Sequence, residues 1–299
     1  MERRIVYSAM AGDDGKKLQT FLKERGFSGQ NLVQLRKEVG RVTADQKPIR
    51  MVDPICEGMK IEVHIPEERS SEKIPPVELP FPVVYEDEDI VVVNKPAHMP
   101  IHPSMNNYQN TLGNAAAFYY RNEPHFVYRC VNRLDRDTTG LTILAKNMLS
   151  ASILGRAIAQ RGITRIYTAI VEGEDLEDDG VIDLPIGRVG ESPILRGIDM
   201  EHGERAITHF HVIGRGGGLT LVQLQLETGR THQIRVHMSA TGHPLIGDFL
   251  YHPSDTRMNR QALHAGEISF DQPVENTFLH FSVDMPEDMM RICREYHLF

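Results

Sequence analysis

Hydrophobic and polar residues alternate in short runs along much of this chain, and helical patterns lie between the runs. A period of two predicts strands in residues 58–65, 141–146, 164–171 and 219–227. Two further apolar runs, within 83–96, flank an acidic turn and predict a hairpin. The chain is therefore expected to contain many short strands with helices between them.

Residues 1–66 predict a small separate unit of two short helices and a few strands. Apolar residues recur at helical spacing in 18–22 and again in 32–35, after a glycine-containing break. Residues 67–82 are rich in Glu, Ser and Pro and show no apolar period, so they predict an extended linker. Residues 83–299 are expected to form the main domain.

Helix boundaries in the main domain are indicated by capping residues. Asn147 is a predicted N-cap for a helix with an apolar stripe, which Gly162 would end. Thr231 is predicted to cap a later helix of about ten residues that ends at Gly242. Arg235 would then lie one turn inside that helix, with its guanidinium aimed at a fixed place. A last strand and helix are expected to close the core near the C-terminus.

Composition narrows the class of protein without naming it. The hydrophobic and charged fractions of 40% and 25% are ordinary for a globular domain. No apolar run approaches the roughly 20 residues that span a bilayer, and the start lacks the apolar stretch of a secretory signal. Three widely spaced cysteines argue against a disulfide framework or a zinc site. A cytoplasmic protein without membrane or metal partners is expected.

The charge distribution matters more than the net charge. A net charge of -8 argues mildly against a nucleic-acid partner, because phosphates favour basic surfaces. Residues 129–165, however, hold seven cations and two carboxylates, a local balance of +5. Acidic residues dominate elsewhere, as in 172–179. A local basic surface therefore keeps a nucleic-acid partner possible.

The polar loop before the strand at 141–146 is the first candidate for chemistry. It carries Arg133, Asp135, Arg136 and Asp137 close together. A carboxylate on a loop at the root of a rigid strand is well placed for catalysis. A solvated cluster of salt bridges is the alternative, and charge alone does not decide between the two.

Other polar residues give weaker signals. Tyr167 shares a strand face with Arg165, so it is a candidate to line a cleft, with a core tyrosine as the alternative. Prolines around His98 and His102 prevent a helix from presenting both rings to a metal. His232 is five residues before a second histidine, too far around a helix for joint metal binding. No metal site is predicted.

Five segments together resemble the RluA-type pseudouridine synthases. They are YEDEDIVVVNKPAHMPIHPS, NRLDRDTTGLTILAKN, TRIYTAIVEG, LVQLQLETGRTHQIRVHMSATGHPLIGD and RQALHAGEISF, in the order of that family. They cover the chain from about residue 85 to 285, and the second and fourth are the most specific. Residues 1–66 resemble the ribosomal-protein-type RNA-binding module that precedes some RNA-modifying enzymes, although a generic small α+β domain is the alternative. The basic residues of this unit are Lys16, Lys17, Arg36, Lys37, Arg41 and Lys47.

The resemblance implies an α+β catalytic domain on a curved, largely antiparallel mixed sheet, with flanking helices and a central cleft. It implies an RNA uridine isomerase without cofactor or metal. Asp135 would be the catalytic carboxylate, Tyr167 would stack on the target base and Arg235 would pair with Asp135. Arg133 would help to hold the RNA with the uridine flipped out of its stack. The further RNA contacts expected are Asn132, Arg136, Lys146, Arg165, Arg230 and His232.

One residue departs from the family pattern. The family usually has histidine before Arg-Leu-Asp, and this chain has Asn132. Asparagine donates and accepts hydrogen bonds but does not titrate. None of the roles above requires a proton shuttle at this position, so activity is expected to be retained.

Several alternatives stay open. Large-subunit ribosomal RNA is the expected substrate, because the front unit resembles that of ribosomal members; tRNA is the alternative. Asp135 could act as a nucleophile or as a base that removes a sugar proton. A non-catalytic RNA-binding or ribosome-assembly protein could keep the same fold. A glycoside hydrolase is disfavoured because Asp135 and Asp137 are too close in sequence to flank a sugar. The oligomeric state stays open with a monomer favoured, and the sequence has no heptad or sustained apolar seam from which to argue it.

Overall fold

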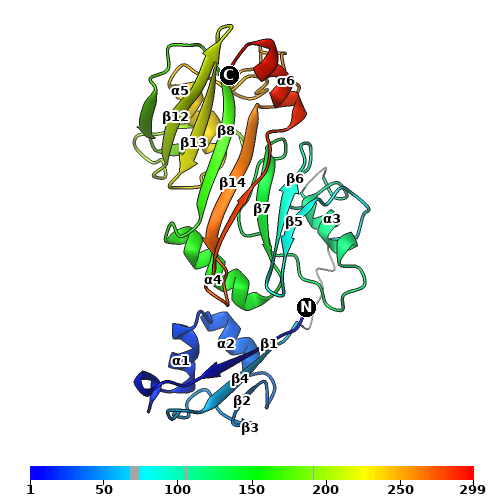
Figure 1. Cartoon of the computed structure of the whole chain (residues 1–299), viewed down its shortest axis with the longest axis vertical. Helices are drawn as coiled ribbons and strands as arrows, with labels where there is room; N and C mark the ends of the chain where they lie inside the picture. Colours follow the sequence, from blue (N-terminus) through cyan, green and yellow to red (C-terminus); the bar gives the residue numbers. More distant parts are fainter. Residues whose placement is uncertain (68–73, 105–106, 191) are drawn as a thin grey trace.

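The computed structural model describes residues 1–67, 74–104, 107–190 and 192–299. The N-terminal unit has a four-stranded sheet in the order β1-β4-β2-β3 and two helices that pack on it (Figure 1). The strands are β1 (Arg3–Ser8), β2 (Val42–Ala44), β3 (Lys47–Pro48) and β4 (Lys60–Ile65), and the helices are α1 (Leu18–Glu24) and α2 (Gly29–Leu35). A short 3-10 turn, η1 (Ala11–Asp13), follows β1. Both predicted helices are therefore confirmed.

The first strand of this unit was missing from the sequence prediction. Ile5 is the one buried residue of β1, so the strand shows no strong alternation. Its place is set by pairing with β4, in which Ile61, Val63 and Ile65 are buried. Tertiary pairing, rather than local pattern, makes this segment a strand.

Part of the predicted linker lies outside the described residues, namely 68–73. Residues 75–82 form no helix or strand. Ile74, Leu79 and Phe81 nevertheless pack against the core of the main domain. This stretch therefore lies along the domain that follows it.

The main domain is built on one nine-stranded sheet. Its strand order is β5-β6-β7-β14-β8-β13-β12-β9, with β15 paired to β14. All neighbouring strands are antiparallel except β7 and β14, which run parallel. The expected largely antiparallel mixed sheet is confirmed. The strands are β5 (Val83–Glu86), β6 (Ile90–Lys95), β7 (Thr139–Ala145), β8 (Thr164–Glu172), β9 (Asp179–Asp183), β12 (Ile207–Gly216), β13 (Leu219–Leu226), β14 (Leu263–Asp271) and β15 (Phe278–Ser282).

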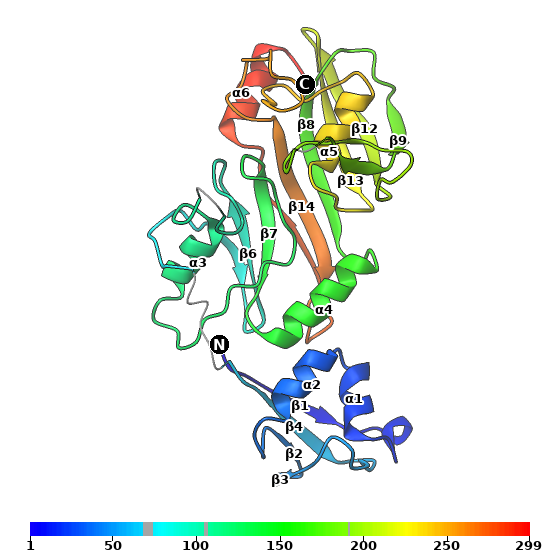
Figure 2. The same cartoon turned by 180° about the vertical axis from the view of Figure 1, so that it is seen from behind.

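Within the described residues, four helices and a two-stranded ribbon complete the domain (Figure 2). The helices are α3 (Leu112–Tyr119), α4 (Met148–Ala159), α5 (Gln233–Ala240) and α6 (Glu287–Glu295), and the ribbon pairs β10 (Ile186–Arg188) with β11 (Arg196–Ile198). The Asn147 side chain accepts hydrogen bonds from the backbone N–H groups of Leu149 and Ser150, so the predicted cap of α4 is confirmed. No helix within the described residues is long and apolar enough to cross a membrane.

The predicted cap of α5 is wrong. The helix begins at Gln233, after His232 in the left-handed conformation with φ of 58°, and no side chain caps it there. The Gln233 side-chain oxygen instead accepts hydrogen bonds from Arg230 N–H and the Thr228 hydroxyl. The first residue of the helix thus reaches back to hold the preceding turn, and a cap at Thr231 is not needed. The predicted end at Gly242, which has a φ of 87°, is confirmed.

The parallel contact between β7 and β14 joins the two halves of the sheet. Gly140 pairs with Ala265 there and has a φ of 115°. A β-carbon at Gly140 would lie 2.2 Å from the Ala265 carbonyl oxygen. Only glycine allows this approach, which draws the polar loop before β7 against β14.

The N-terminal unit contacts the start of α4, as both views show (Figures 1 and 2). Arg3 pairs with the buried carboxylate of Asp89 at 3.1 Å, and the same carboxylate accepts a hydrogen bond from the α4 cap Asn147. Ser152 of α4 donates to the Gly26 carbonyl oxygen. The unit is therefore fixed at the end of β7 opposite the polar loop.

Candidate active site

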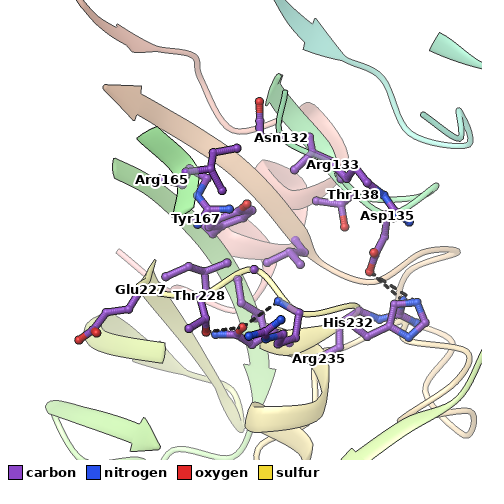
Figure 3. Close-up of a pocket in the computed structure, with 18 of the residues that line it drawn as sticks. Asn132, Arg133, Asp135, Thr138, Arg165, Tyr167, Glu227, Thr228, His232 and Arg235 are labelled. Atoms are coloured by element: carbon purple, nitrogen blue, oxygen red, sulfur yellow. Dashed lines mark hydrogen bonds and ion pairs between the residues drawn. The ribbon is translucent and has the colours of Figure 1, made fainter. Parts of the chain in front are cut away.

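A cavity of about 660 Å³ lies at the middle of the main sheet (Figure 3). Its lining comes mainly from three parts of the chain: the polar loop at 131–138, β8 with the end of α4, and the segment 226–235. These parts are far apart in the sequence. The antiparallel β8–β13 pair and the parallel β7–β14 pair bring them together.

Asp135, Arg235 and Asp248 form a continuous ion-pair chain at one side of the cavity. Arg235 Nη1 donates to Asp135 Oδ2 at 3.0 Å, while its Nε and Nη2 donate to Asp248 at 2.7 and 2.8 Å. Burial alone would lower the pKa of Arg235, but the hydrogen bond to Asp248 and the charge of Asp135 raise it above its ordinary value. Arg235 is 2% exposed and Asp135 26% exposed. The fixed guanidinium thus presents a partly open carboxylate to the cavity.

Aromatic rings and a histidine enclose this ion-pair chain. The Arg235 guanidinium lies 5.1 Å from the Tyr251 ring centre and 5.7 Å from that of Phe249, within the range of cation–π contacts. His232 is hydrogen-bonded through Nδ1 to the Tyr251 hydroxyl, and its Nε2 lies 3.9 Å from Asp135. Burial lowers the pKa of His232, so the ring is neutral at pH 7. Arg235 therefore supplies the positive charge beside Asp135.

Two buried basic side chains, those of Lys95 and Arg260, hold the backbone of the polar loop. Lys95 Nζ donates to the carbonyl oxygens of Pro96, Met99 and Arg136 at 2.8 to 3.0 Å. Arg260 Nη1 donates to the Asp137 carbonyl oxygen at 3.2 Å. Burial lowers the pKa of Lys95 to about 7, against the opposing charges of Asp137 and Asp135. The loop that carries Asp135 is therefore anchored by direct bonds to the two residues that follow it, Arg136 and Asp137.

The second carboxylate of the loop is occupied by its neighbours. Asp137 accepts hydrogen bonds from Arg136 and is hydrogen-bonded to His98 at 2.8 Å. Its side chain is buried, and it does not line the cavity. Asp137 thus stabilises the loop, and the His98 ring is hydrogen-bonded to this carboxylate rather than directed into the cavity.

Asn132 lies in the cavity wall, but its amide is bonded to the protein. Its Nδ2 donates to the Leu141 carbonyl oxygen, and its Oδ1 accepts from Ile143 N–H. The residue is almost fully buried. The side chain that replaces the usual histidine therefore anchors the loop to β7.

The opposite wall of the cavity is one face of β8. Tyr167 and Arg165 alternate with outward-facing residues, and both are buried at the cavity (Figure 3). Burial raises the pKa of the Tyr167 hydroxyl; the Arg165 charge lowers it and the Asp135 charge raises it. Both charges thus act on the phenol, and its ring faces the space in front of Asp135.

The remaining predicted RNA contacts separate into three groups. Arg133 and Arg230 line the cavity and are exposed to solvent. Arg136 is half-exposed beside Asp137 and outside the lining. Lys146 lies away from the cavity, because β7 separates it from the loop by roughly 20 Å. There Lys146 pairs with Glu86 at 2.8 Å and is mostly buried.

Three residues of the site were missed by the sequence analysis: Asp248, Lys95 and Arg260. Each acts through a partner distant in the chain, so no local pattern marks it. All three lie within the segments that resemble the synthase family. Their position within those segments was the one feature of the sequence that could have marked them as site residues.

One cluster has the composition of a metal site within the described residues, namely Glu172, His252 and Asp255. The Arg257 guanidinium contacts both carboxylates of this cluster. A permanent cation therefore already offsets part of the negative charge of these acids. The cluster lies outside the cavity lining.

Comparison with known proteins assigns the family. Residues 89–240, which include Asp135, Tyr167 and Arg235, match the RNA pseudouridylate synthase family model. The chain is 35% identical over 278 residues to YjbO of Bacillus subtilis, named an uncharacterized RNA pseudouridine synthase, covering 93% of this chain and 98% of the relative. The chain belongs to the RluA-type RNA pseudouridine synthases. The synthase has the α+β fold and isomerase class that its sequence motifs predict.

Two more relatives define what the match covers. Ribosomal large subunit pseudouridine synthase D of Vibrio cholerae is 41% identical over 231 residues, covering 72% of the synthase and 70% of the relative. The solved structure of human RNA Pseudouridylate Synthase Domain Containing 1 matches with a TM-score of 0.59 and 27% identity, covering 69% of the synthase and 83% of that chain. The match to YjbO extends further along the synthase than either of these.

Proposed function

We propose that the synthase converts a uridine of large-subunit ribosomal RNA to pseudouridine, with Asp135 as the catalytic carboxylate. The geometry of Asp135 carries this proposal. Arg235 pairs with its carboxylate at the cavity wall, at 3.0 Å, and Tyr167 faces the space in front of it. The ribosomal target rests on the relatives named as ribosomal large subunit pseudouridine synthases.

The target uridine must leave its stack to reach the cavity, at a cost of a few kcal/mol. Stacking of the base on Tyr167 recovers about 1–3 kcal/mol of this cost. Asp135 then either attacks the sugar carbon C1′ or removes the proton from C2′. In both cases the bond from C1′ to N1 breaks, uracil turns, and a bond from C1′ to C5 forms.

The exposed cations at the cavity mouth are proposed to hold the RNA backbone. Arg133 and Arg230 have the exposure that phosphate contacts require. Asn132 and His232 support this site from within the protein, through their bonds to β7 and Tyr251. Lys146 has no part in the proposal.

The N-terminal unit is proposed to extend the RNA-binding surface. It has its own sheet and an apolar core to which Leu149 of α4 also contributes; the separate sheet supports a division into 1–66, a linker at 67–82 and a catalytic domain at 83–299. A monomeric, cytoplasmic enzyme fits this organisation and the proposed ribosomal substrate.

Mapping pseudouridines in cellular RNA with and without the gene tests the target. The proposal expects at least one site in large-subunit ribosomal RNA to disappear. A missing site confined to tRNA would overturn the ribosomal assignment and leave the enzyme class intact.

Replacement of the carboxylate tests the catalytic residue. Asp135→Asn should lower conversion by at least about 10³-fold, the scale of lost nucleophilic or acid–base catalysis. Asp175→Asn is the matched control, because this carboxylate is 92% exposed and outside the cavity. Full activity of Asp135→Asn would remove Asp135 from its proposed role.

A further inference from the structure

Arg165 is a buried cation without a protein partner. It is 8% exposed, and within the described residues its guanidinium makes no hydrogen bond or ion pair. Its Nε is among the few buried polar atoms that lack a partner. Buried charges are ordinarily paired, because desolvation without a counter-charge is unfavourable. The exception lies in the wall of the cavity that contains Asp135.

The two carboxylates that line the cavity, Glu227 and Asp135, form ion pairs with residues other than Arg165. Glu227 pairs with Arg161 and His209. Asp135 pairs with Arg235 at 3.0 Å. The protein therefore leaves the positive charge of Arg165 for a group that enters the cavity.

Arg165 is more deeply buried than Arg133 and Arg205, the other cavity-lining arginines without an ion pair in the described part of the chain. Arg133 and Arg205 line the cavity and are exposed to solvent, as contacts with RNA phosphates would require. Arg165 is buried on the same strand face as Tyr167, two residues away (Figure 3). A β-carbon at Gly229 would lie 3.0 Å from Arg165 Nη1, so the guanidinium packs against a glycine backbone. This position is beside Tyr167, the ring proposed to stack on the target base, rather than among the exposed cations proposed to hold the RNA backbone.

The proposed reaction, on which this inference rests, moves a negative charge across the cavity. When the bond from C1′ to N1 breaks, its electron pair goes to uracil. Asp135 loses its charge in the same step, because it becomes a neutral ester if it attacks C1′ and a neutral acid if it removes the C2′ proton. Uracil becomes an anion with its charge shared among N1, O2 and O4. Before this step the negative charge lies beside Arg235, and after it the charge lies on the base.

We propose that Arg165 binds the detached uracil anion and stabilises it until C5 attacks the sugar. The guanidinium donates to a uracil carbonyl oxygen, where negative charge develops only as the glycosidic bond breaks. Such an interaction lowers the barrier because it is stronger in the transition state than in the bound substrate. When C5 joins C1′, the charge leaves the ring and Asp135 is regenerated; C5 then loses its proton as N1 gains one, which gives neutral pseudouridine.

The test compares two leaving groups in one RNA. Fluorine at C5 withdraws electrons and stabilises the uracil anion without help from the protein. The substrate is a transcribed fragment of large-subunit ribosomal RNA that contains the mapped site, made with uridine or with 5-fluorouridine. Single-turnover loss of the original nucleoside is followed by nucleoside analysis at saturating RNA.

Arg165→Met should slow the loss of uridine about 10²–10³-fold, the scale of one deleted oxyanion donor. The loss should be at least tenfold smaller with 5-fluorouridine, and RNA affinity should change less than twofold. Arg133→Met is the matched control: it should weaken RNA binding and affect both nucleosides equally. Arg165→Gln serves as a second neutral variant in case Arg165→Met does not fold.

Equal losses with the two nucleosides, or a loss confined to RNA affinity, would overturn the role of Arg165. A wild-type protein inactive on every RNA would instead overturn the proposed function, and this inference with it. An active wild type with an unaffected Arg165→Met variant would reject the inference alone.

Discussion

Arg235 and Arg165 are both buried in the wall of one cavity, but their surroundings are opposite. Arg235 has two carboxylate partners, Asp135 and Asp248, at 2.7 to 3.0 Å. Arg165 has none within the described part of the chain. The two residues lie on opposite sides of the space in front of Asp135, on α5 and β8 (Figure 3).

The contrast suggests how one cavity can stabilise a negative charge in two places: on Asp135, beside Arg235, and on the detached uracil, beside Arg165. Arg235 is part of the folded structure, because the protein supplies its counter-charge. Arg165 is prepared for a charge that exists only during the reaction. Stability and catalysis should therefore respond differently to the loss of each guanidinium.

Removal of Arg235 should have the largest effect on stability. Arg235→Met leaves Asp248 buried without its partner, and breaking a buried pair in this way costs about 3–5 kcal/mol. Urea denaturation of the free protein measures this loss. Arg230→Met, at a half-exposed arginine in the same segment, is the control and should cost less than about 1 kcal/mol. Equal stabilities of the two variants would show that Asp248 does not depend on Arg235.

The ion pair between Arg136 and Asp137 can also be broken by acid, which protonates the Asp137 carboxylate. Burial would raise the pKa of Asp137, but Arg136 and His98 hold it below the ordinary 3.8. Since the folded pKa is below the unfolded one, this stabilisation is present above pH 3.8 and is lost as the pH falls through the folded pKa. Asp137→Asn should cost about 1–3 kcal/mol at pH 7.

The pH dependence of this cost is the decisive measurement. The difference in unfolding free energy between wild type and Asp137→Asn should shrink as the pH falls below 3.8. Urea titrations at pH 7, 5 and 3 follow it. A difference that stays constant over this range would mean that the charge of Asp137 does not stabilise the loop.

Local signals predicted the elements whose determinants lie close together in the sequence. The Asn147 cap is bonded to the first residues of its own helix, and the alternation of 164–171 gave both β8 and the shared face of Arg165 and Tyr167. The cap at Thr231 failed because Gln233 reaches back to the preceding turn. A capping propensity does not show which of two neighbouring side chains holds the turn.

The partners of the site residues needed the tertiary structure. Asp248 and Lys95 act on Arg235 and on the loop across long gaps in the chain, and no periodicity records such pairs. Lys146 was included because of its charge and its nearness in sequence, and a seven-residue strand separates it from the site. The resemblance identified Asp135 and Arg235 as a pair, but it did not indicate that Arg165 would be left unpaired.

The smallest expected change in stability is also the one that tests the contrast most directly. Arg165→Met removes a buried charge that has no counter-charge, so the unfolding free energy of the free protein should stay within about 1 kcal/mol of wild type or rise. Urea denaturation without RNA measures it, beside Arg235→Met in the same buffer. A clear loss of stability would mean that the Arg165 guanidinium is bonded within the folded protein, and the contrast with Arg235 would then fail. Unchanged or higher stability together with slower uridine conversion would show that the protein keeps this unpaired charge for its substrate.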